Sequence, residues 1–128
     1  HAVFSSYHDV AWWALRNLVG NLLRHTLPYP LIKAPDLPSF ARVTVMKQPG
    51  RRLVHLLAYV PEHRGTSVDM IEEPARIGDV QLALRHDGAD IARVYLAPAE
   101  QDLEWTRDEH YIHTTVPDVR GYALIVFE

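Results

Sequence analysis

The side chains with the most evident chemical potential in this sequence are its histidines, of which there are eight in 128 residues. Imidazole is a common ligand of transition metals, and ligands on a strand recur at i and i+2 because alternate side chains share one face. The closest pair, His110 and His113, would point to opposite faces, and the absence of any H-x-H pair argues against a cupin-type metal enzyme. His55 lies within an apolar segment, where a hydrogen-bonded structural histidine is expected. We therefore predict no metal site and no cofactor.

Carboxylates are the second group that could carry catalysis. They occur as adjacent pairs, Glu72 with Glu73 and Asp108 with Glu109. A glycosidase needs two carboxyl groups that face each other about 5 to 10 Å apart, and neighbouring loop residues do not supply that geometry. The sequence also lacks a G-x-S-x-G elbow, a P-loop and a glycine-rich dinucleotide turn. No catalytic residue is therefore predicted.

Aromatic side chains offer a binding chemistry instead. An aromatic ring can stack on the apolar face of a sugar, and a few polar groups then orient the ligand. Trp105 and Tyr111 are the candidate sugar-binding residues. Each is also a plausible packing residue of a β-sheet protein, so both interpretations stay open.

The composition narrows the class of protein. The chain is 48% hydrophobic and 23% charged, with a formal net charge of -3, which is typical of an ordinary globular domain. Scattered basic residues do not form the positive face that nucleic acid requires, and no apolar run is long enough for a membrane span. The absence of cysteine fits a reducing compartment. We expect no nucleic-acid or membrane partner and a cytoplasmic location.

The elements that would position these side chains begin with a helix, predicted over residues 9–27. Ser6 is its expected cap, and the prolines from Pro28 onward end it. Trp13 falls on the side opposite the main apolar stripe, so the helix has apolar surface in two directions. Such a helix needs a partner on each side, and the residues expected to dock are Trp12, Trp13, Leu15 and Val19.

Strands follow a connector over residues 28–38, which contains four prolines and should be stiff and extended. The segment 52–60 is apolar on both faces, which predicts a central strand that is covered on both sides. Residues 61–77 form a charged loop that could serve as a lid or a docking arm. The predicted fold is mainly β: an antiparallel β-sandwich preceded by one amphipathic N-terminal helix. The other predicted strands cover 41–48, 79–85, 91–97, 111–116 and 121–127, with a turn at "PDVRG" before the last.

An ordered series of segments resembles a known family. The segments are "VFSSYHDVAWWALRNLVGNLLRHTLPYPLIK", "ARVTVMKQPGRRLVHLLAYVPEHRG", "IEEPARIGDVQLALR", "ARVYLAPAEQDLEW" and "VPDVRGYALIVFE". Together they resemble the C-terminal portion of bacterial glycoside hydrolases that carry a β-galactosidase trimerisation-type domain. The resemblance implies that residues 1–27 are the last helix of a flavodoxin-like domain, residues 28–38 the connector and residues 39–128 a terminal β-sandwich. Ala58 stands where the family's "HLLNY" strand has asparagine.

The same resemblance implies a function. The family's catalytic carboxylates belong to a (β/α)8 barrel, and none is carried over to this chain, which starts at His1 as if it were a piece of a longer protein. We expect a non-catalytic structural and assembly module that docks on the upstream barrel portion and oligomerises through the parent enzyme. The alternatives are a free-standing carbohydrate-binding sandwich and a small metal-dependent β-fold enzyme.

Overall fold

The structure is a computed structural model that describes Ser5, Asp9, Val10 and residues 12–128. The chain divides into two compact units, His1–Pro30 and Leu31–Glu128. The boundary falls inside the segment predicted to be the connector.

The first unit contains helix α2, which spans Trp13–Thr26. Asp9 and Val10 are also helical, as predicted, but α2 itself begins after Trp12, its N-cap, which has extended backbone and no side-chain capping bond. The expected cap, Ser6, lies outside the described residues. The C-terminal end agrees with the sequence: the Leu27 amide donates to Leu23 O at 2.8 Å, and Pro28 follows. No helix in the described part of the chain has the length and apolar character that a membrane span requires.

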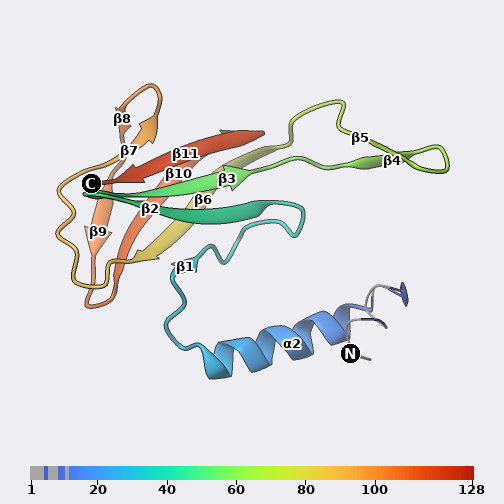
Figure 1. The fold of residues 1–128 in the computed structure, drawn as a ribbon, viewed down its shortest axis with the longest axis horizontal. Helices are drawn as coiled ribbons and strands as arrows, with labels where there is room; N and C mark the ends of the chain where they lie inside the picture. Colours follow the sequence, from blue (N-terminus) through green and yellow to red (C-terminus); the bar gives the residue numbers. More distant parts are fainter. Residues whose placement is uncertain (1–4, 6–8, 11) are drawn as a thin grey trace. The chain divides into compact units, whose positions relative to one another are not determined.

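The second unit consists of β-strands arranged in two layers, which are visible in Figure 1. The strands are β1 (Ile32–Lys33), β2 (Arg42–Gln48), β3 (Arg51–Leu57), β4 (Glu62–Arg64), β5 (Val68–Met70), β6 (Arg76–Arg85), β7 (Val94–Ala97), β8 (Gln101–Asp102), β9 (Trp105–Arg107), β10 (Tyr111–Arg120) and β11 (Tyr122–Phe127). Every pairing among them is antiparallel. One layer has the order β1-β6-β10-β9, and the other has the order β2-β3-β11-β7-β8. The predicted antiparallel sandwich with a preceding helix is confirmed.

The core lies between the two layers. Side chains from the inner faces of β6 and β10 pack in one cluster with those of β3 and β11. The largest side chains with almost no exposure are Phe127, Leu56, Leu84, Ile112 and Ile125. Burial of these apolar groups is the main favourable term that holds the layers together.

A corner at Gly121 joins the layers. β10 passes into β11 through the single register pair Arg120↔Tyr122. Gly121 has φ +73°, and a Cβ there would lie 2.7 Å from Pro74 Cβ and 2.8 Å from Tyr59 Oη. Only glycine fits this position without strain or a clash.

β3 is an interior strand between β2 and β11, as predicted. It is covered on both faces only at its beginning. There Leu53 packs with Tyr95 and Val126, because β7 lies beside the same end of β11. Leu57 at the other end is 38% exposed, since β7 does not extend that far. The prediction of cover along the whole strand is therefore wrong, and the strand ends three residues earlier than expected.

The segment predicted as a long loop is a hairpin. β4 and β5 pair with each other and extend away from the sandwich layers in Figure 1. All of their residues are exposed, and His63 Nδ1 on β4 lies 2.8 Å from Asp69 Oδ1 on β5. Arg64 pairs with Glu62 on the same strand at 2.8 Å and with Glu72, beyond the end of β5, at 3.1 Å. The predicted turn at "PDVRG" is also wrong, because β10 continues through Pro117 to Arg120. The pairing with β6 omits Pro117, which has no amide hydrogen to donate.

Candidate functional site

A groove of about 640 Å³ lies along strands β6, β10 and β9. This volume is within the range of small-molecule sites, about 300 to 1,000 Å³. Most of its lining side chains are polar. The lining residues are Gln81, Leu82, Leu103, Glu104, Trp105, Thr106, His113, Thr114 and Thr115.

The alternation of β10 sets which side chains reach the groove. Successive residues of a strand point to opposite faces, and on β10 buried residues alternate with exposed His113 and Thr115. Thr106 on β9 is the partner of His113, and Gln81 on β6 is the partner of Thr115. The four polar side chains therefore form two adjacent cross-strand pairs on one outer face.

The segment that leads into β9 forms the rim of the groove. The Leu103 amide donates to Val94 O at 2.9 Å, which connects this segment to the other layer. Thr114 is buried, and its hydroxyl donates to Glu104 O at 2.8 Å. Trp105 packs against the core beside this rim. The position of the Glu104 and Trp105 backbone is therefore fixed from both layers.

An acidic turn holds the beginning of β10. Asp108 Oδ1 accepts hydrogen bonds from the amides of His110 and Tyr111 at 2.7 and 2.6 Å. Its Oδ2 lies 2.7 Å from His113 Nε2. The bond with His113 first, and then those with the two amides, hold the pKa of the Asp108 carboxyl well below its usual range. The carboxylate thereby orients the imidazole that lines the groove.

The two residues predicted to bind sugar lie in different environments. Trp105 lines the groove. Tyr111 is 3% exposed, and the Lys33 ammonium lies 3.9 Å from the centre of its ring. A stacking residue must offer a free ring face to the ligand, and Tyr111 has none to offer.

The residues predicted to dock lie on or next to α2. Trp12 and Trp13 are 55% and 69% exposed, whereas Leu15 and Val19 are half-buried. Leu22 adds a further exposed apolar side chain on the same helix. The helix has no buried residue.

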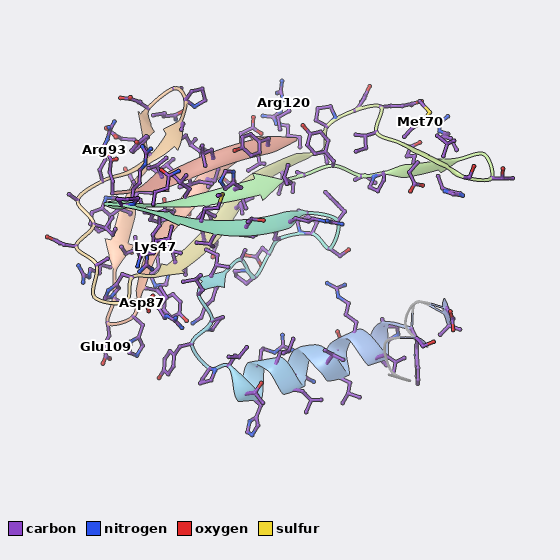
Figure 2. All side chains as sticks on the ribbon, viewed as in Figure 1. Lys47, Met70, Asp87, Arg93, Glu109 and Arg120 are labelled. Atoms are coloured by element: carbon purple, nitrogen blue, oxygen red, sulfur yellow. The ribbon has the colours of Figure 1, made fainter. Side chains whose placement is uncertain are left out.

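A second cluster of charged side chains connects the two layers of the fold. The Arg52 side chain, 12% exposed, donates to the carbonyls of Arg85 and His86 and pairs with Asp87 at 3.3 Å. It thereby connects β3 of one layer to the end of β6 in the other. Asp87 and Glu109 lie at the same end of the sandwich in Figure 2. His86 connects the two turns, with Nδ1 accepting from the Gly88 amide and Nε2 lying 3.1 Å from Glu109 O.

The remaining histidines do not gather into a metal site. Among the described residues, no group of three or more His, Cys, Asp or Glu side chains is placed to hold a metal ion. His55 has Nδ1 2.8 Å from Tyr122 Oη, and its buried Nε2 has no partner in the part of the chain that the structure describes. His55 lies on a face of the sheet, and its contact with Tyr122 indicates a structural role.

Sequence reasoning missed Gln81, Thr106 and Thr115 as groove residues. No pattern in the sequence marks Gln81 or Thr106, and in "YIHTTV" the polar residues His113 and Thr115, two positions apart, mark a shared face but not a concave one. Their pairing across three strands became visible only with the register.

Comparison with known proteins adds one strong likeness. The fold matches part of α-L-fucosidase isoenzyme 2 from Paenibacillus thiaminolyticus, with a TM-score of 0.92 and 29% sequence identity over 98% of this chain. The chain corresponds in fold to one part of a glycoside hydrolase. It covers 19% of the fucosidase chain.

The other comparisons are weaker. A cycloisomaltooligosaccharide glucanotransferase from Paenibacillus sp. matches with a TM-score of 0.52 and 17% identity, over 76% of this chain and 18% of that one. At this identity the likeness shows the fold alone. No protein-family model matches the sequence, and no curated protein matches it.

Proposed function

We propose that this chain is a non-catalytic module of a glycoside hydrolase, which packs on the catalytic part of that enzyme. The observation that carries the proposal is the likeness to about a fifth of a fucosidase over nearly the whole of this chain. The chemistry of the groove supports it, because Glu104 is the only carboxylate among the lining residues. Asp108, which contacts the lining residue His113, is already engaged with that imidazole and with two backbone amides. Glycoside hydrolysis needs two free carboxyl groups.

The proposed docking element is α2. An isolated helix of 14 residues is marginal in water, and helices of globular proteins gain most of their stability by packing an apolar face. Trp12 and Trp13 expose more than half of their surface, which is unusual for tryptophan. We propose that they dock on the catalytic part, a (β/α)8 barrel, and that the parent enzyme is a homo-oligomer.

The proposal that this chain has no catalytic activity is tested by incubating the full chain with 4-nitrophenyl glycosides, including the α-L-fucoside. The expected result is no release of nitrophenol above the uncatalysed rate. Turnover that disappears in a Glu104→Gln variant would overturn the proposal, because it would place a catalytic carboxylate in this chain. A Glu62→Gln variant, which changes an exposed hairpin carboxylate, is the matched control.

Docking is tested by mass spectrometry of one sample under native and then denaturing conditions. The expected result is a second, larger polypeptide with glycoside hydrolase sequence in stoichiometric complex with this chain. Trp13→Asp should break that complex, because it places a charge in a desolvated contact, while Thr66→Asp, at the exposed turn between β4 and β5, should not. A complex that survives Trp13→Asp unchanged would count against Trp13 as a docking residue.

A further inference from the structure

The two outer faces of the sandwich differ in character. The outer face of β6, β10 and β9 carries the polar cross-strand pairs described above, as is usual for a layer that faces water. The outer face of β2, β3 and β11 is mainly apolar. Its register places Leu57 beside Tyr122, and Leu53 between Met46 and Val126. An apolar outer face of this kind indicates a surface that a further layer or a partner covers.

This apolar face of β2, β3 and β11 is only partly covered by the chain itself. Leu53 and Val126 are buried, since they pack with Tyr95 of β7. Leu57, Tyr122 and Met46 are 38%, 45% and 50% exposed. The ring of Tyr122 lies along the face, because its Oη is 2.8 Å from Nδ1 of His55 in the next row. Its position is therefore set before a partner binds, which lowers the entropic cost of docking.

A groove of about 410 Å³ continues the apolar face beyond the ends of the strands. Its lining is mainly apolar and includes Phe40, Leu57, Tyr59, Pro61 and Ile71. Ile71 follows β5, so the base of the β4–β5 hairpin forms one wall of the groove. Pockets of this kind accept the apolar anchor residues that dominate the energetics of protein interfaces.

The charge of the apolar face indicates what kind of partner fits it. Arg42 lines the groove and has no ion-pair partner in the described part of the chain. The strands β2, β3 and β11 contain no aspartate or glutamate. Two copies of this chain joined through the face would bring Arg42 against a surface whose strands supply no carboxylate, which gives no electrostatic complementarity. A partner that presents a carboxylate beside an apolar side chain fits better than a second copy does.

We propose that the apolar face and its groove are the surface through which the sandwich packs on the catalytic part of a glycoside hydrolase. An apolar side chain of that part occupies the groove, and a carboxylate of that part pairs with Arg42. The inference rests on the proposed function and adds to it a docking surface on the second unit and the chemistry of the partner. Most of the fucosidase chain lies outside the part that matches this chain, so an enzyme of that kind has ample surface to cover the face.

The test is hydroxyl-radical footprinting, read by mass spectrometry, of the full chain in complex with the larger glycoside hydrolase polypeptide and after separation from it. Oxidation of Met46 and Tyr122 should fall several-fold in the complex. Oxidation of His113, which is exposed on the polar outer face of the other layer, should not change.

Each other outcome has a distinct meaning. A complex in which Met46 and Tyr122 are oxidised as fast as in the separated chain would overturn this inference and leave the proposed function standing. The absence of any such complex would refute the proposed function and, with it, the partner named here. Protection of the same two residues in the isolated chain at high concentration would identify a second copy as the occupant and would also overturn the inference.

Variants locate the contact. Leu57→Asp and Arg42→Glu should each weaken the complex about tenfold or more, measured by titration of the full chain into the larger polypeptide. Lys47→Glu is the matched control, because Lys47 is also an exposed cation of β2 but points to the opposite side of the strand from Arg42. Urea denaturation checks that the variants are folded. Folded Leu57→Asp and Arg42→Glu variants that bind as tightly as the Lys47→Glu control would overturn the proposal.

Discussion

Replacement of Gly121 by alanine should destabilise the sandwich far more than an ordinary glycine substitution. A left-handed backbone conformation costs an L-residue roughly 1 to 2 kcal/mol, and Gly121 has φ +73°. The added Cβ would also lie closer to Pro74 Cβ and Tyr59 Oη than real Cβ contacts allow. Overpacking of this kind typically costs a further 1 to 3 kcal/mol or so.

The corner has little freedom to relax. The Gly121 amide donates to Ala75 O at 3.0 Å, and Gly121 O accepts from the Ala58 amide at 2.7 Å. A shift that relieved the clash would break these bonds between the two layers. We therefore expect a total loss of about 2 to 5 kcal/mol in the free energy of unfolding.

Urea denaturation of the full chain measures this loss, and Gly50→Ala is the matched control. Gly50 has nearly the same φ, +74°, but a Cβ there would meet nothing within 4 Å. The Gly50→Ala control should lose only the contribution of the left-handed backbone conformation, about 1 to 2 kcal/mol of the free energy of unfolding. Equal losses in the two variants, within about 0.5 kcal/mol, would refute the argument that the close approach at the corner matters.

Two further predictions concern polar groups. Arg52→Ala should cost about 2 kcal/mol in urea denaturation, because it leaves two carbonyls at the junction of the layers without their charged donor, whereas Arg51→Ala, at an exposed position, should cost little. Asp108→Asn should lose stability relative to the natural chain at neutral pH, since the lowered pKa of Asp108 means that the folded state favours the carboxylate. That difference should shrink as the pH falls below about 4, where the unfolded chain takes up the proton. A difference that stayed constant down to pH 2 would contradict the assigned role of the Asp108–His113 contact.

The strands that bury one face could be predicted from the sequence, because strict alternation carries the information. β2 is an example, whereas β11 is a continuous apolar run with buried side chains on both faces; both were placed within a residue or two of their observed bounds. The end of β10 was misjudged because Pro117 normally interrupts a strand, and only the register shows that pairing omits it. The hairpin of β4 and β5 was missed because both strands are short and all of their residues are exposed, which leaves no apolar period.

The residues of the candidate site were harder to predict from the sequence than the fold was. Trp105 stood out by residue type, but the polar residues that line the groove come from three strands, of which β6 is distant in sequence from β9 and β10. Tyr111 stood out equally and proved to be buried under Lys33. Residue type indicates which side chains could bind a sugar, while exposure and register, which depend on tertiary packing, decide which of them are accessible to a ligand.

The strand order has a consequence for synthesis of the chain on the ribosome. β11 lies between β3 and β7 in its layer, yet it is made after every other strand of that layer. Until residues 122–127 have emerged, the edges of β3 and β7 that will receive β11 remain unpaired. Unpaired edges and uncovered apolar strands are prone to associate with other chains. Nascent chains halted before residue 122 should therefore depend on chaperones, whereas chains that include β11 can complete the layer on their own.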